Sequence, residues 1–140
     1  MKKSVLKYVL LMFVSIFVQN SYAQNKKVKS VNFNEITKAG SFTEYVSKKG
    51  NLISVGDTLQ IGDPTNNDRF AYITQNDGYL RADKANKKLV VKAINVSGDA
   101  KKGYNVYFTM KGLGATPVLL KYEEALEMKE ISLVNKDSLQ

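Results

Sequence analysis

The sequence predicts a small, mainly β domain: an antiparallel barrel or sandwich with one or two short helices, one of them near the C-terminus. From Leu52 onward, short segments rich in Val, Ile, Leu, Tyr and Phe follow one another, such as TLQIG, RFAYITQ, KLVVKAINV and GYNVYFTM. Turn formers such as GD, NDG and SGDAKKG separate these segments. Several segments also alternate apolar and polar residues, which is the period of a strand with one buried face. Regular short strands with such turns indicate a compact antiparallel barrel or sandwich.

The N-terminus predicts a secretory signal peptide over residues 1–23. Three lysines precede an apolar run, Tyr8–Val18, and the small residues of SYA follow at 21–23. This run is shorter than the roughly 20 residues of a membrane span, so we expect cleavage before Gln24 and no transmembrane span afterwards. The chain has no cysteine, which excludes a lipid-modified cysteine. The predicted localisation is therefore export, to the periplasm or beyond the cell.

The remaining chain predicts one domain of ordinary size. Residues 24–30 are polar and basic and read as a flexible leader, residues 31–133 as a single β-rich domain, and residues 134–140 as a polar tail. Of 21 Lys and Arg, three lie in the signal peptide, so 18 basic residues face 13 acidic ones, a net charge of +5. Several lysines form pairs dispersed among turns, which is typical of solubility rather than of a nucleic-acid footprint. We expect no nucleic-acid partner.

Within the domain, the pattern assigns the elements in order. Ser41 with Glu44 three residues later forms a capping box, and Gly50 follows a basic turn, so Ser41–Gly50 favours a short helix over the competing strand. Alternation places Leu59 and Ile61 inside. It also places a set of strand residues inside, Tyr104, Val106, Phe108 and Met110, with Asn105, Tyr107 and Thr109 outside.

Two further segments complete this assignment. LVVKAINV is apolar on both faces except for Lys92 and reads as a central strand. YEEALEMKEI has helix formers with Leu126 and Ile131 on one face, and it predicts the C-terminal helix.

The stretch GDTLQIGDPTNNDRFAYI, residues 56–73, is open to three interpretations. A phosphate-binding loop needs a lysine followed by Ser or Thr after its glycines, and none follows here. A calcium loop finds oxygen ligands in Asp63, Asn66 and Asp68, but their spacing is not that of an EF-hand. These residues are weak metal candidates, and no cofactor is predicted. Asx residues beside a proline also form turns through their own backbone, so the stretch reads mainly as a connection between strands.

The motifs VGDTLQIGDP, FAYI, LVVKAI and YEEALEMKEI give the chain a resemblance to a group of small exported proteins of the Bacteroidota. These proteins pair a GD-T-L-x-x-G-x-P turn with a closing E-x-A-L/I-x-x-x-E-I helix, and the likeness covers about Val55 to Ile131. This chain has Lys129 where that pattern usually has a glycine. The group has no established biochemical function, so the resemblance implies a fold and a compartment and supplies no active site.

Composition disfavours an enzyme. The chain has no histidine and no cysteine, the residues most used for proton transfer, thiol nucleophiles and zinc binding. Glu123 and Glu124 are adjacent on the predicted helix and so face different directions, which makes them a poor catalytic pair. A minor hydrolase or a calcium-dependent module that uses the acidic turns is the alternative function.

The favoured function is an exported, non-catalytic binding or interaction module, with an envelope protein as the first expected partner and a glycan as the second. Tyr107 should face outward beside Thr109, and Tyr79 lies near Arg81 just after a turn. An exposed tyrosine flanked by polar groups suits a sugar ring or a protein partner. Lys92 extends the candidate surface toward an anionic ligand. Taken singly, each of these tyrosines is more often an ordinary half-buried strand residue than a binding residue.

Overall fold

The computed structural model of the chain describes residues 29–134. The predicted signal peptide, most of the predicted leader and most of the predicted tail lie outside these residues. Two turns of 3-10 helix, Phe33–Glu35 and Ala82–Lys84, and one α-helix, α2 (Tyr122–Glu127), lie within them. The strands are β1 (Ser30–Asn32), β2 (Gly40–Phe42), β3 (Glu44–Val46), β4 (Leu52–Ser54), β5 (Thr58–Ile61), β6 (Arg69–Gln75), β7 (Gly78–Arg81), β8 (Lys88–Asp99), β9 (Gly103–Lys111), β10 (Val118–Lys121) and β11 (Ile131–Leu133).

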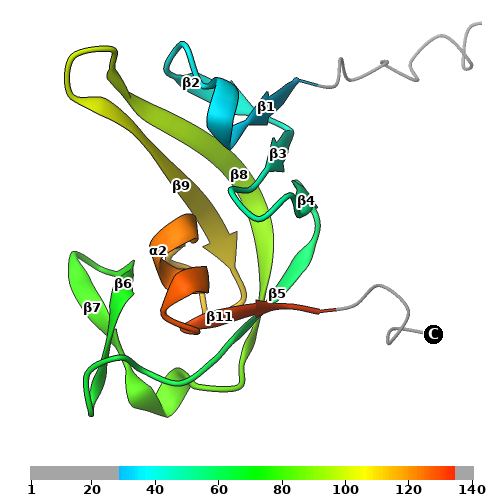
Figure 1. The fold of residues 1–140 in the computed structure, drawn as a ribbon. Coiled ribbons are helices and arrows are strands. Elements are labelled where there is room, and N and C mark those ends of the chain that lie inside the picture. Colours follow the sequence, from blue (N-terminus) through cyan, green and yellow to red (C-terminus); the bar gives the residue numbers. More distant parts are fainter. Residues whose placement is uncertain (1–28, 135–140) are drawn as a thin grey trace, which may run out of the picture.

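These strands form two sheets. The larger sheet has the order β11-β5-β8-β9-β10-β6-β7, with β2 also paired to β8, and its neighbouring strands run antiparallel. It curls into a half-barrel, and α2 packs against β6, β9, β10 and β11 on its concave side (Figure 1). The smaller sheet, β1-β3-β4, lies beside it. The predicted mainly β fold with a helix near the C-terminus is confirmed.

The predicted inward and outward faces agree with the observed burial. Leu59 and Ile61 are fully buried on β5. On β9, Val106, Phe108 and Met110 are buried and alternate with more exposed residues, as a strand with one face on the core requires. Strand β8 is central, as predicted, because it pairs with β2, β5 and β9.

The predicted helix over Ser41–Gly50 is wrong. This segment forms β2, β3 and the turn before β4, and the Ser41 hydroxyl donates to Asn95 Oδ1 on β8 at 2.9 Å instead of capping a helix. Phe42 pairs with Ile94 and Tyr45 with Ile53, so both aromatic side chains enter the core through strand pairing. Local capping signals contribute about 1 kcal/mol, less than the burial of two aromatic side chains, and the tertiary pairing decides the structure.

The C-terminal helix is also shorter than its apolar pattern suggested. It ends at Glu127, and Ile131 begins β11, paired with Ile61 of β5, rather than continuing the helical face. Lys129 has a positive φ of 61°, its N–H donates to Leu126 O, and the N–H of Glu130 donates to Ala125 O. This pair of bonds is a Schellman motif, whose left-handed position usually holds glycine. The helix therefore ends through a lysine in a conformation that glycine adopts without strain.

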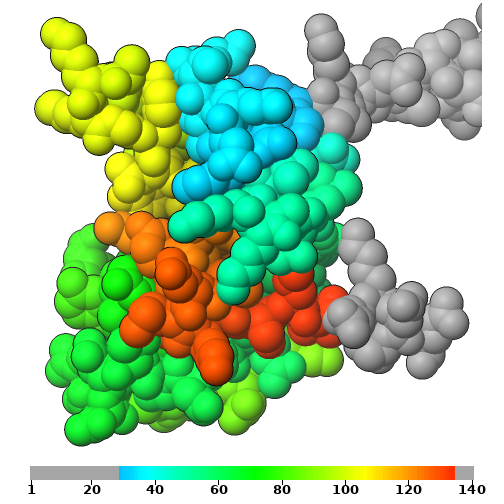
Figure 2. Space-filling model, viewed as in Figure 1, coloured from blue at the N-terminus to red at the C-terminus, as the bar shows by residue number. Residues whose placement is uncertain are grey.

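The core is organised around three aromatic rings. Tyr45, Phe108 and Tyr122 are buried with ring centroids 4.6 to 5.7 Å apart, and the Tyr45 hydroxyl donates to a carboxylate oxygen of Glu123 on α2. Burial, followed by this hydrogen bond and the charge of Glu123, raises the pKa of Tyr45 far above its usual value. Burial and the same charge raise the pKa of Tyr122. Figure 2 shows α2 and β11 (orange to red) enclosed between the segment around β4 (teal) and the segment around β6 (green).

We expect Lys129→Gly to stabilise the protein. The substitution removes the strain of a side chain in the left-handed region, partly offset by the larger entropy of glycine in the unfolded chain, for a net gain of about 0.5–1 kcal/mol. Urea unfolding of the two chains measures this difference. Lys129→Ala, which keeps a Cβ atom in the strained position, serves as the control and should show no such gain. Equal stabilisation by both substitutions would contradict the conformational explanation.

We expect the free energy of unfolding to fall as the pH rises above 10. The folded-state pKa values of Tyr45 and Tyr122 are raised, so the unfolded chain releases these protons first and gains stability relative to the fold. Each tyrosine contributes up to about 1.4 kcal/mol per pH unit. Urea unfolding at pH 8, 10 and 11 measures the slope, and Tyr45→Phe should flatten it. An identical slope in Tyr45→Phe would show that other groups cause the loss.

Candidate functional site

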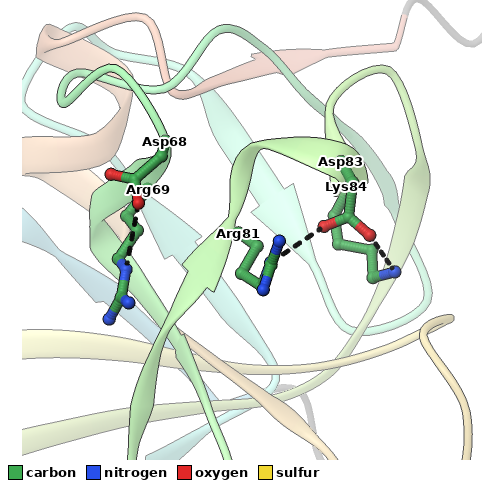
Figure 3. Close-up of polar contacts among 5 residues, drawn as sticks. All are labelled: Asp68, Arg69, Arg81, Asp83 and Lys84. Atoms are coloured by element: carbon green, nitrogen blue, oxygen red, sulfur yellow. Dashed lines mark hydrogen bonds and ion pairs between the residues drawn. The ribbon is translucent and has the colours of Figure 1, made fainter.

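The candidate metal ligands of the acidic turn between β5 and β6 lie on the surface. Asp63, Asn66 and Asp68 are all exposed, and Asp68 instead forms an ion pair with Arg69, with 3.5 Å between Oδ2 and Nε (Figure 3). The backbones of Asn66 and Arg69 exchange two hydrogen bonds, which makes the segment between them a tight turn. Within residues 29–134, no three His, Cys, Asp or Glu side chains cluster as metal ligands.

The turn is held from inside the protein by Glu130. This side chain is fully buried, and its carboxylate accepts hydrogen bonds from the backbone N–H groups of Thr65 (3.1 Å), Ala71 (2.7 Å) and Tyr72 (2.9 Å). We call these four residues the Glu130 cluster. A buried carboxylate is tolerated when hydrogen bonds replace its lost hydration, and three backbone donors do so here. The stretch that connects β5 to β6 is thus a structural loop tied to the segment after α2.

The Glu130 cluster also explains an irregularity in β6. Arg69 pairs with Arg81 of β7 and Thr74 pairs with Tyr79, so the register shifts between these two pairs. The shift removes Ala71 and Tyr72 from the regular ladder with β7, and their N–H groups bond to Glu130 instead. Irregular strand positions of this kind change the direction in which side chains point. Here, both Ala71 and Tyr72 line a hollow on the outer face of the sheet.

This hollow, which we call the tyrosine groove, has a volume of about 330 Å³. Its three tyrosines come from three strands, β6, β7 and β9, and β10 supplies an apolar residue and a cation. The residues that line it are Ala71, Tyr72, Thr74, Tyr79, Tyr107, Leu119 and Lys121. The Lys121 ammonium lies 5.8 Å from the centroid of the Tyr107 ring, within the range of a cation–π contact. The groove therefore combines aromatic faces, hydroxyl groups and one positive charge.

The structure brings together two of the residues that the sequence singled out. Tyr107 and Tyr79, which are 28 positions apart, line the same groove. Thr109 lies on the same face of β9 and pairs with Leu119 of the groove. Tyr79 is 58% exposed, so most of its ring remains available to a ligand.

The other two predicted residues do not line the groove. Lys92 is exposed at a bulge in β8, where the register with β9 shifts between Val91 and Ala93. Arg81 lies two residues beyond Tyr79 on β7, and its Nε is 4.0 Å from Asp83 (Figure 3). A hydrogen bond from Lys84, with the charges of Lys84 and Arg81, holds the pKa of Asp83 below its usual value.

A second hollow of about 300 Å³ adjoins the tyrosine groove and shares Thr74 and Leu119 with it. Its other lining residues come from the β6–β7 turn and from the residues before β10, namely Gln75, Asn76, Asp77, Thr116 and Pro117. Asn76 and Asp77 have positive φ angles of 52° and 59°, as a two-residue hairpin turn requires. The side-chain amide of Gln75 donates to the carbonyl oxygens of Leu113 and Thr116 and thereby fixes the loop before β10 against β6.

The sequence pattern did not single out Tyr72, Leu119 and Lys121, although alternation would have placed all three on the outer face. Val118 and Leu120 point inward on β10, which leaves Leu119 and Lys121 outside. On β6, Tyr72 and Thr74 flank the buried Ile73, and the alternation breaks only before them, because Phe70 is buried three positions before Ile73.

Of the adjacent carboxylates Glu123 and Glu124, the first is held by hydrogen bonds from the smaller sheet and the turn that follows β3. Glu123 accepts hydrogen bonds from the Tyr45 hydroxyl and from the backbone N–H of Lys48, so it joins α2 to β3 and the turn after it. Its contacts are structural.

None of the helices in residues 29–134 is both long enough and apolar enough to cross a membrane. Comparison of the chain with protein-family models, with curated proteins and with solved structures finds no match. Any functional conclusion for this chain therefore depends on the geometry of its own residues.

We expect Glu130→Ala to destabilise the protein by about 3–5 kcal/mol, because it leaves three backbone donors, two of them on β6, without their acceptor. Glu130→Gln should cause a smaller loss, since its amide keeps one acceptor oxygen. Urea unfolding measures both. Glu127→Ala, which removes an exposed glutamate from the last turn of α2, is the matched control and should change stability by less than about 0.5 kcal/mol. A loss of the same size in both alanine variants would show that the Glu130 cluster contributes nothing specific.

Proposed function

We propose that this chain is an exported, non-catalytic binding module whose ligand lies in the tyrosine groove. The observation that supports this proposal is the convergence of Tyr72, Tyr79 and Tyr107, from three strands, on one hollow. Its volume of about 330 Å³ falls in the range of small-molecule sites. Tyrosine offers an apolar ring face with a hydroxyl at its edge, which suits a sugar ring or the side chain of a protein partner.

The rigidity of the groove also supports binding. Its walls are strand residues, and the irregular part of β6 is held by hydrogen bonds to the buried carboxylate of Glu130. A site that is ordered before the ligand arrives loses less conformational entropy on binding. The groove also contains no carboxylate among its lining residues, and the chain has no histidine or cysteine, so it lacks the groups that most often move protons or attack a substrate.

Retention of ligands from an envelope extract tests the proposal. The exported chain is immobilised, and the retained proteins and glycans are quantified for the wild type, Tyr79→Ala, Tyr107→Ala and Leu52→Ala. Leu52 is the matched control because it is 56% exposed, close to the 58% of Tyr79, but lies on β4 of the smaller sheet. We expect the two tyrosine variants to lose about tenfold in affinity, as central aromatic contacts do, and Leu52→Ala to bind normally.

Three outcomes would contradict the proposal in different ways. Normal binding by both tyrosine variants would place the ligand site elsewhere on the molecule. No retained ligand would contradict a binding module. Loss of retention on calcium chelation would instead support the calcium-dependent alternative, in which the exposed acidic turn at 63–68 takes part.

A further inference from the structure

We propose that the ligand of the tyrosine groove is an acidic glycan, a chain of sugar rings that carry carboxylate groups. This inference rests on the proposed binding function and adds the chemical class of the ligand. It follows from the arrangement of side chains across the outer face, from the charges in and around the groove, and from the fact that the groove lies on a sheet face.

Strand pairing aligns the side chains of the outer face in two rows. Paired residues make the first row, which crosses β2, β8, β9 and β10 through Ser41, Asn95, Tyr107 and Lys121. The second row crosses β8, β9, β10, β6 and β7 through Ala93, Thr109, Leu119, Thr74 and Tyr79. Neighbouring strands are about 4.8 Å apart, so a row of five spans about 19 Å. The surface is therefore long enough for a chain of rings rather than a single ring.

Apart from Lys121, the polar side chains of these rows are uncharged, and hydrogen bonds orient three of them. Ser41 donates to Asn95 Oδ1 at 2.9 Å, and the Asn95 amide lies 3.5 Å from the Thr109 hydroxyl as a donor. Hydroxyl and amide groups can both donate and accept hydrogen bonds, as sugar hydroxyls do. Each row also contains one tyrosine, and aromatic faces together with neutral hydrogen-bonding groups match the apolar faces and hydroxyl edges of sugar rings.

The charges explain why the glycan should be acidic. Lys121 is the charged residue of the tyrosine groove, and within residues 29–134 neither it nor Lys92 has an ion-pair partner. In contrast, Arg69 and Arg81, on the neighbouring part of β6 and β7, are each paired with an aspartate (Figure 3). An unpaired ammonium group beside an aromatic hollow favours an anionic ligand group at that point.

The location of the groove favours a glycan over an acidic peptide. An extended peptide gains most of its affinity by pairing its backbone with a free strand edge. The groove lies instead across a sheet face, and β9, β10 and β6 each have a hydrogen-bonded strand on both sides. The groups that face the ligand are therefore side chains, which suit hydroxyl and carboxylate groups. A peptide would be expected at the outer edge of β7.

Matched oligosaccharides test the inference. Tetrasaccharides of galacturonate, glucuronate, mannuronate and guluronate are each compared with their methyl esters, which keep the sugar but lose the charge. Binding is followed by tyrosine emission, which is readable because the chain has no tryptophan, and by calorimetry. We expect at least one acid to bind about fivefold more tightly than its ester, the order of an exposed ion pair. Lys121→Gln should remove this difference.

Lys111→Gln is the control, because Lys111 is an exposed lysine on β9 that does not line the groove. It should leave the preference for the acid unchanged, whereas Tyr107→Ala should weaken the acid and its ester alike. Equal binding of acid and ester would overturn the acidic-glycan inference and leave the binding function intact. The inference would also be overturned if none of the eight sugars bound while an aspartate hexapeptide bound in a way that depends on Tyr107. If no sugar binds, the peptide does not bind and the envelope extract yields no ligand, both the acidic-glycan inference and the proposed binding function are contradicted.

Discussion

The buried carboxylate of Glu130 is the constraint on which the rest of the structure depends. The larger sheet curls but stops short of closure, with β11 and β7 at its two ends. Glu130 lies next to β11 and binds backbone N–H groups of β6, so a side chain connects two parts of the sheet that no strand ladder connects. Its own backbone carbonyl accepts the N–H of Gly62 at the end of β5. One residue thereby fixes the β5–β6 connection, the end of α2 and the irregular part of β6.

This arrangement accounts for the local departures from regular structure. A Cβ atom on Gly62 would lie 2.2 Å from the carbonyl oxygen of Lys129, so the two segments approach as closely as glycine allows. Lys129 adopts its left-handed conformation because the chain must turn sharply after α2 to bring Glu130 inside and Ile131 into β11. The strain at Lys129 and the close contact at Gly62 both result from burying one carboxylate.

The inner and outer faces of the larger sheet have separate roles, and both belong to the structure that Glu130 holds in place. On the inner face, Tyr45, Phe108 and Tyr122 pack together, and Glu123 joins the smaller sheet to α2. On the outer face, Tyr72 and Thr74, which flank the buried Ile73 of β6, line the tyrosine groove together with Tyr107. The proposed site is thus carried by strands whose opposite side is buried core, which holds its tyrosines in fixed positions. Its single cation, Lys121, sets the charge that a ligand should complement.

The sequence by itself determined the β class, the central position of β8, the alternating faces of β5 and β9 and the helix near the C-terminus, because these depend on local periodicity. It also indicated Tyr79 and Tyr107 one at a time. Only the tertiary structure decided that Ser41–Gly50 forms strands, because pairing with β8 and β4 outweighs a local cap. It also decided that two distant tyrosines share a groove, and that Glu130 is buried rather than solvated. These features depend on contacts between residues far apart in the chain, such as the 59 positions between Ala71 and Glu130, which no local pattern encodes.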